Sequence, residues 1–133
     1  MRAAVLLVLS GCYVGNYRNL GGPFVGTRAS VGCLDVAVAL TDDELARAPI
    51  VAYELGNHCS HTTLVDFTAV RVTDGRRELP PIDPRHELRP LHLDAWSSGD
   101  ERIAYASSTA GRVCVDLGRL DADHPGPPAW TCL

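Results

Sequence analysis

The sequence contains no lysine, so each of its 12 basic residues is an arginine. With 16 acidic residues the chain carries a net charge of −4, and it has no run of basic residues. Nucleic acids and anionic lipid headgroups bind through clustered cations, so we expect no nucleic-acid partner. Long apolar runs are also absent. The longest, Ala3–Leu9, is far shorter than the ~20 residues that a membrane-spanning helix needs.

Signals for a helical domain and for a catalytic centre are missing as well. No segment sustains the 3.6-residue apolar period of an amphipathic helix. No serine or cysteine stands in a nucleophile elbow or a recognisable triad, so we expect no enzyme activity. Asp42-Asp43-Glu44 is acidic, but no glycine-bearing loop of the calcium-binding type surrounds it. No cofactor is expected.

The chain does have a distinctive N-terminus. Arg2 supplies a positive charge, the apolar run follows, and Leu9-Ser10-Gly11-Cys12 closes it with small residues and a thiol. A charged start, a short apolar core and small residues at a cut site are typical of an export signal. The four closing residues resemble the lipobox of bacterial lipoproteins. A secretory or other apolar N-terminal segment with a chance cysteine is the alternative.

The resemblance implies an anchored protein. Residues 1–11 would be a signal peptide, and Cys12 would be acylated and begin the mature chain. The expected location is the bacterial cell envelope, and Tyr13 favours the outer over the inner membrane if the cell is Gram-negative. The expected partners are the membrane, through the lipid on Cys12, and an envelope protein. Residues 12–32 are rich in glycine, which predicts a flexible tether with a reach of about 25 Å.

The remaining cysteines predict disulfide bonds. Cys33, Cys59, Cys114 and Cys132 are even in number, and an oxidising compartment favours their pairing. We favour Cys33–Cys59 with Cys114–Cys132, because each joins segments that are close in sequence. A bridge from Cys59 to Cys114 is left open. Each favoured bridge would stabilise the fold by about 3 kcal/mol in the chain-entropy model.

Short segments with a two-residue apolar period predict an all-β domain over residues 33–121. The expected strands are 34–40, 50–55, 62–72, 77–79, 88–96, 103–105 and 113–117. This pattern favours an immunoglobulin-like or fibronectin III-like β-sandwich of six to seven short antiparallel strands. The arrangement is similar to that of small sandwich domains on many bacterial lipoproteins.

Several local features complete the expected fold. Residues 41–47 are expected to form one helical turn, residues 97–100 a turn, and residues 122–133 a proline-rich tail. Trp96 is expected in the core. If Leu40 pairs with Val51, the first two strands place Cys33 opposite His58, one residue from Cys59.

Two segments are candidates for a functional site. His58-Cys59-Ser60-His61 holds two imidazoles and a thiol, but its spacing does not match the usual zinc motifs and Cys59 is needed for a disulfide. We therefore expect no metal site here. In the alternative, in which this segment does bind a metal, His58 and His61 are the candidate ligands.

The second candidate is a charged loop. Its residues Asp83, Arg85, His86 and Glu87 are expected to form an interaction surface, because loops at the end of a sandwich often carry binding. The sequence thus predicts a lipid-anchored interaction module of the cell envelope without catalysis. A metal-handling lipoprotein that uses His58 and His61 is the first alternative, and an envelope hydrolase is the second.

Overall fold

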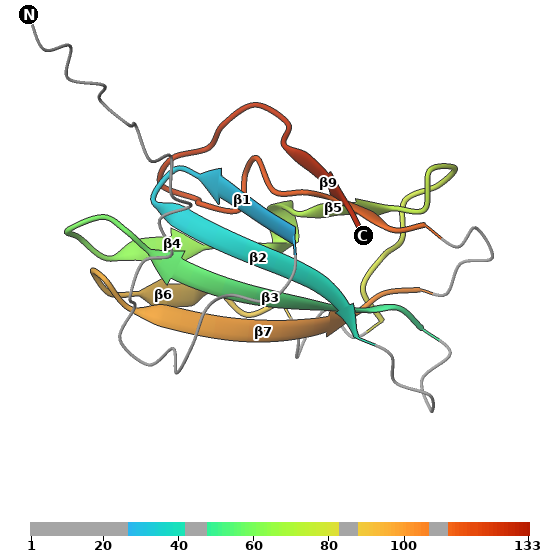
Figure 1. Cartoon of the computed structure of the whole chain (residues 1–133), viewed down its shortest axis with the longest axis horizontal. Helices are drawn as coiled ribbons and strands as arrows, with labels where there is room; N and C mark the ends of the chain where they lie inside the picture. Colours follow the sequence, from blue (N-terminus) through green and yellow to red (C-terminus); the bar gives the residue numbers. More distant parts are fainter. Residues whose placement is uncertain (1–26, 42–47, 83–87, 107–111) are drawn as a thin grey trace, which may run out of the picture.

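The computed structural model describes residues 27–41, 48–82, 88–106 and 112–133, drawn in colour in Figure 1. These residues form nine strands and one short 3-10 helix, arranged in three antiparallel sheets. The expected all-β class and sandwich are confirmed, although the described residues hold more strands than the six to seven expected. No helix among them has the length and apolar character needed to cross a bilayer.

The largest sheet has four strands. It consists of β1 (Thr27–Val31), β2 (Leu34–Thr41), β3 (Ile50–Asn57) and β7 (Ser98–Ala104), in the order β1-β2-β3-β7. The register between β2 and β3 is the one expected from the sequence, with Leu40 opposite Val51. It follows that the His58 N–H donates to the Cys33 carbonyl, at 2.9 Å.

Two smaller sheets provide the strands that close the other side of the core. β4 (Thr63–Val65) pairs with β6 (Leu91–Leu93). The second small sheet has the order β5-β8-β9 and contains β5 (Arg71–Thr73), β8 (Cys114–Asp116) and β9 (Trp130–Cys132). Figure 1 shows β4 and β6 toward one end of the long sheet, and β5 and β9 toward the other.

One apolar cluster joins the sheets. Alternate residues of the central strands point into it, as the two-residue period of a strand requires. Its members from the three sheets include Leu34, Val36, Val38, Val51, Tyr53, Leu55, Val65, Leu93, Ile103, Val72 and Val115. All three sheets therefore share one core.

A buried tyrosine pair lies inside this cluster. The hydroxyl groups of Tyr53 and Tyr105 are 2.8 Å apart, and the Tyr53 ring meets Phe67 edge to face at a centroid distance of 5.3 Å. Burial, followed by the adjacent Tyr105 hydroxyl, raises the pKa of Tyr53 well above its usual value. The phenol therefore stays neutral, and its hydrogen bond satisfies a polar group inside an apolar core.

The strand expected at 62–72 is wrong, because two strands of different sheets occupy this segment. β4 ends at Val65, and the 3-10 helix η1 (Phe67–Ala69) separates it from β5. The Asp66 carboxylate accepts the Thr68 N–H at 2.9 Å and so caps η1. A side chain that bonds its own backbone offers an alternative to strand pairing, and here it redirects the chain.

The segment around Trp96 also differs from expectation. β6 covers only Leu91–Leu93, and β7 begins at Ser98, within the stretch expected to turn. Trp96 is 51% exposed rather than buried, with a φ of 57° in the left-handed region. The turn lies earlier, where the Ser97 N–H donates to the Asp94 carbonyl at 3.1 Å.

The sandwich extends beyond both boundaries expected for it. The expected tether includes β1, whose Ala29 and Val31 pack against the core. The expected tail includes β9, which pairs with β8. Gly32 makes the first extension feasible, since it has a φ of +55° and stands first in the two-residue turn between β1 and β2. A turn of this length with glycine in that place is favoured between antiparallel strands.

Some expectations fall outside the described residues. These are the signal peptide 1–11, Cys12 with the tether up to residue 26, the helical turn over 42–47, and the charged loop residues Asp83, Arg85, His86 and Glu87.

Candidate functional site

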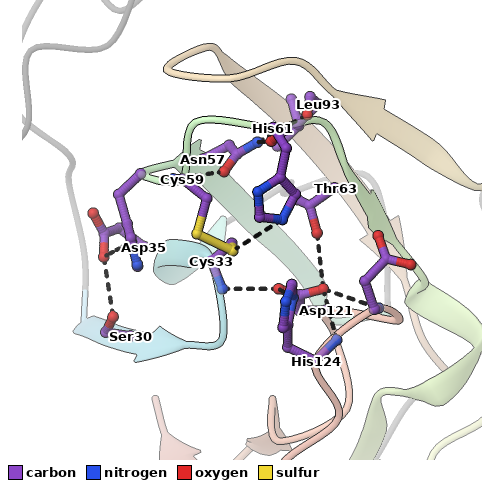
Figure 2. Close-up of a disulfide and its surroundings, with 12 residues drawn as sticks. Ser30, Cys33, Asp35, Asn57, Cys59, His61, Thr63, Leu93, Asp121 and His124 are labelled. Carbon is purple, nitrogen blue, oxygen red and sulfur yellow. Dashed lines mark hydrogen bonds and ion pairs between the residues drawn. A yellow bond between two sulfur atoms is a disulfide. The ribbon is translucent and has the colours of Figure 1, made fainter.

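Two disulfides connect the four cysteines of the sandwich. Cys33 is bonded to Cys59 with their Cα atoms 5.3 Å apart, and Cys114 is bonded to Cys132 across β8 and β9. The favoured pairing is confirmed, and the Cys59–Cys114 bridge is wrong. The first disulfide lies among most of the histidines and buried polar groups discussed below, as Figure 2 shows.

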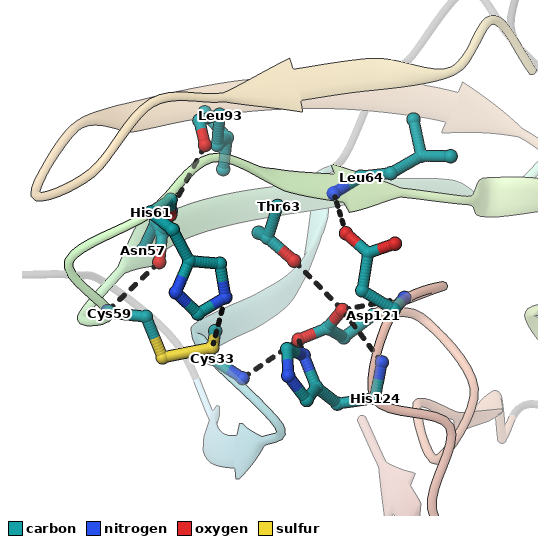
Figure 3. Close-up of polar contacts among 10 residues, drawn as sticks. Cys33, Asn57, Cys59, His61, Thr63, Leu64, Leu93, Asp121 and His124 are labelled. Atoms are coloured by element: carbon teal, nitrogen blue, oxygen red, sulfur yellow. Dashed lines mark hydrogen bonds and ion pairs between the residues drawn. A yellow bond between two sulfur atoms is a disulfide. The ribbon is translucent and has the colours of Figure 1, made fainter.

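Asn57 fixes the loop that carries Cys59. Its fully buried side chain accepts the Cys59 N–H at 2.9 Å and donates to the carbonyls of His61 at 2.7 Å and Leu93 at 3.0 Å. A third carbonyl, of Asp94, lies at 3.2 Å. Figure 3 shows how these bonds tie the loop to the end of β6. The positions of Cys59 and His61 are therefore set by a core residue of β3.

A buried carboxylate organises the opposite side of the disulfide. Asp121 is fully buried and accepts the Cys33 N–H at 2.8 Å and the Thr63 hydroxyl at 2.8 Å. It also accepts the backbone N–H groups of Asp123 at 3.0 Å and His124 at 3.2 Å, and its Oδ2 lies 3.1 Å from His124 Nδ1. One side chain thus joins the β1–β2 turn, β4 and the loop before β9.

The charge of Asp121 follows from this environment. Burial by itself raises the pKa of a carboxyl group, but the hydrogen bonds from Cys33, Thr63, His124 and Asp123 outweigh it and lower the pKa of Asp121. The group is ionised at neutral pH. Because five donors occupy its oxygens, it serves to hold the fold and is not free to accept a substrate proton.

Gly32 allows the close approach of Asp121 to the disulfide. A Cβ atom at this position would lie 2.5 Å from the Asp121 carboxylate oxygen and 2.9 Å from the His124 Cβ. No side chain fits there. The positive φ and the contact with Asp121 both require glycine next to Cys33.

Two histidines face the disulfide from different segments. His61 Nε2 lies 3.8 Å from Cys33 Sγ, and the His61 and His124 rings are 5.7 Å apart between centroids. The ligand atoms of Cys33, Cys59 and His61 all lie within 4.8 Å of one another, and so do those of Cys33, Asp121 and His124. These two groups share Cys33 and form one polar cluster, shown in Figure 3.

His58 lies elsewhere. Its Nδ1 is 3.1 Å from the Asp35 carboxylate, which also accepts the Ser30 hydroxyl at 3.1 Å. Among the described residues, neither group of three potential metal ligands includes His58. The fold therefore combines His61 with His124, which comes from the segment expected to be a tail, rather than with His58. No local spacing in the sequence indicates this long-range contact.

No protein-family model matches this chain, and no curated protein or solved structure matches it either.

Proposed function

We propose that this protein is a lipid-anchored binding module of the bacterial cell envelope, an immunoglobulin-like or fibronectin III-like sandwich attached through Cys12. The observation that carries the proposal is the pairing of thiols. Two disulfides use four of the five cysteines in the sequence, which leaves Cys12 for acylation. Disulfides persist in exported proteins, and the thiol left over is the one that ends the lipobox-like segment.

The outer face of the β5-β8-β9 sheet supports the binding role. Arg71 and Trp130 both lie opposite Asp116 in register, so they share this face. The Trp130 side chain is 45% exposed, and the Arg71 guanidinium lies 5.7 Å from the centre of its ring. Arg71 is also paired with Glu78. Tryptophan and arginine dominate the binding energy of many protein interfaces, so an envelope protein is the partner that this surface fits.

Intact-mass analysis of the native protein, extracted from membranes with detergent, tests the anchor. The expected mass lacks residues 1–11, includes acyl groups on Cys12, and is four hydrogens below the mass of the reduced chain because two disulfides are formed. Cys12→Ser, the control, is expected to lose the acyl groups and the membrane fraction. A native chain that keeps Met1 and carries five free thiols would contradict the proposal.

Cross-linking in intact envelopes tests the binding role. Trp130→Ala is expected to reduce a specific cross-linked product by roughly tenfold, because truncation of an interface tryptophan removes a large share of the binding energy. Trp96→Ala is the matched control, since Trp96 is just as exposed but lies in the turn before β7. Equal cross-linking by the two variants would rule out the β5-β8-β9 face as the binding surface.

A further inference from the structure

We propose that Cys33, Cys59, His61 and His124 form a zinc site when the Cys33–Cys59 disulfide is reduced. The site goes beyond the binding role proposed above and does not depend on Cys12 or on the anchor. Two thiolates with two imidazoles are a common ligand set for tetrahedral zinc. The metal and the disulfide exclude each other, because both use the same two sulfur atoms.

One pair of ligands is already at a distance suitable for a tetrahedral centre. A nitrogen of His124 lies within 4.8 Å of Cys33 Sγ, but His124 must move closer to Cys59 and His61. With zinc bonds of about 2.3 Å to sulfur and about 2.0 Å to nitrogen, a sulfur and a nitrogen ligand lie roughly 3.5 Å apart. Cys33 Sγ and His61 Nε2 are already 3.8 Å apart. The two sulfurs are bonded to each other here and would lie roughly 3.8 Å apart in such a site, so the disulfide must open before the metal binds.

Asp121 prepares His124 for this role. His124 Nδ1 lies 3.1 Å from Asp121 Oδ2, so this ring nitrogen is engaged by the carboxylate. The other ring nitrogen, Nε2, is the one left to bind a metal. A carboxylate behind the imidazole is the usual support of zinc-ligating histidines. Asp121 is a positioning residue here and not a ligand.

The surroundings hold the ligands in place while leaving access from solvent. Asn57 binds the His61 carbonyl and the Cys59 N–H, and Asp121 binds the Cys33 N–H. Cys33 is buried, whereas the His61 and His124 side chains are at the surface. A metal ion can therefore reach the site without opening of the core.

The redox step balances with a dithiol as the reductant. The dithiol gives two electrons and two protons to the Cys33–Cys59 bond and becomes a disulfide itself, and two thiols form in the protein. Each thiol then loses its proton when its sulfur binds zinc as a thiolate. In the reverse direction a disulfide is the oxidant: it takes two electrons from the two thiolates and two protons from water, becomes two thiols, and re-forms the Cys33–Cys59 bond. This removes both anionic ligands, leaves the two imidazoles, and releases the metal.

The test uses the full chain, reduced with a water-soluble phosphine, and Co²⁺ as a spectroscopic probe. One Co²⁺ per chain is expected, with thiolate-to-cobalt charge-transfer absorption that Zn²⁺ abolishes by displacement. The oxidised protein is expected to show no such absorption. His61→Ala and His124→Ala are each expected to weaken metal binding at least tenfold, and Cys33→Ala with Cys59→Ala to abolish the charge-transfer band.

Two controls separate this site from other ligands. His58→Ala removes the imidazole that faces Asp35 and is expected to bind Co²⁺ like the wild type. Replacement of both Cys114 and Cys132 by alanine is expected to leave the absorption unchanged. Retained charge transfer in the Cys33→Ala/Cys59→Ala variant, or unchanged binding in both His61→Ala and His124→Ala, would overturn the proposal.

Reduction by itself will unfold part of the protein if the sandwich depends on its disulfides. In that case Zn²⁺ is expected to restore the β-sheet circular dichroism, because metal binding contributes directly to the folding free energy. A reduced chain that neither binds Co²⁺ nor refolds with Zn²⁺ would overturn the site. The intact mass of the native protein decides the anchor separately, whichever result is found here.

Discussion

Asp121→Asn is expected to lower the free energy of unfolding at neutral pH by roughly 3 kcal/mol. Asp121 Oδ2 accepts the Cys33 N–H at 2.8 Å. In asparagine the amide nitrogen would occupy the place of Oδ2 and would face this N–H group. Two donors would then meet, and one buried N–H group would lose its acceptor. The remaining bonds, such as that from Thr63, would also weaken because they would no longer end on a charge. Urea unfolding of the two proteins measures the difference.

The loss of stability in Asp121→Asn is expected to become smaller as the pH falls. Burial raises the pKa of Asp121 in the folded state, but its hydrogen bonds lower this pKa by more. The folded-state pKa is therefore lower than the pKa of an aspartate in the unfolded chain, which is about 3.9. The stabilisation is therefore complete above about pH 4 and is lost as the pH falls through the folded-state pKa. Asparagine does not titrate. The difference in unfolding free energy between the wild type and Asp121→Asn should therefore decrease as the pH falls below about 4.

Asp123→Asn is the control for this experiment. The Asp123 side chain is exposed, and its Oδ2 accepts the Leu64 N–H at 3.1 Å, a bond that asparagine retains through its own oxygen. We expect a change below about 1 kcal/mol. Two results would show that the buried carboxylate is not the organising group. One is an equal loss of unfolding free energy in Asp121→Asn and Asp123→Asn, and the other is a difference between the wild type and Asp121→Asn that stays constant with pH.

The β2–β3 hairpin shows what the sequence can predict. Leu34, Val36 and Val38 alternate with smaller or polar residues, and a one-residue slip in pairing would turn this whole set toward solvent. Only one phase buries it. The structure has this phase, together with the assumed pairing of Leu40 with Val51 and the favoured Cys33–Cys59 bridge near the end of the two strands.

The choice of sheet is harder to predict. The β-branched residues over 62–72 indicate extended chain, but periodicity does not specify which neighbour a strand pairs with. Here Asp66 caps η1 and sends β5 to pair with β8. The capping carboxylate inside a strand-like run was the available signal. Trp96 illustrates the same limit. Its hydropathy predicts burial, but the conformation of the backbone at this tight turn places the side chain at the surface.

The polar cluster was only partly predictable for a related reason. His61 and Cys59 are close in the sequence, so their proximity is a local property. Asp121 and His124 reach them only because the loop before β9 folds back against β4, where the Ala122 N–H donates to the Leu64 carbonyl at 2.9 Å. Contacts of this kind depend on the packing of two sheets, and no spacing along one segment encodes them.

Removal of the Cys33–Cys59 disulfide is expected to cost more stability than removal of the Cys114–Cys132 disulfide. The chain-entropy model gives about 3 kcal/mol for each, and loops spanning 26 and 18 residues differ in it by only about 0.3 kcal/mol. The structural settings differ more. Cys33 and Cys114 are both buried, but only Cys33 donates its N–H to the buried Asp121. Cys33→Ala/Cys59→Ala therefore also loosens a packed polar site, adding about 1 kcal/mol.

Cys114→Ala/Cys132→Ala provides the comparison. These two residues already lie opposite each other in the β8–β9 ladder, and the Leu133 N–H donates to the Val113 carbonyl at 2.8 Å, so backbone bonds hold the pair without the bridge. Urea unfolding gives the two losses, and hydrogen exchange at the amide of position 33 reports whether the first variant loosens the bond to Asp121. The reverse order of stabilities, or unchanged exchange at that amide, would mean that the buried disulfide does not support the Asp121 network.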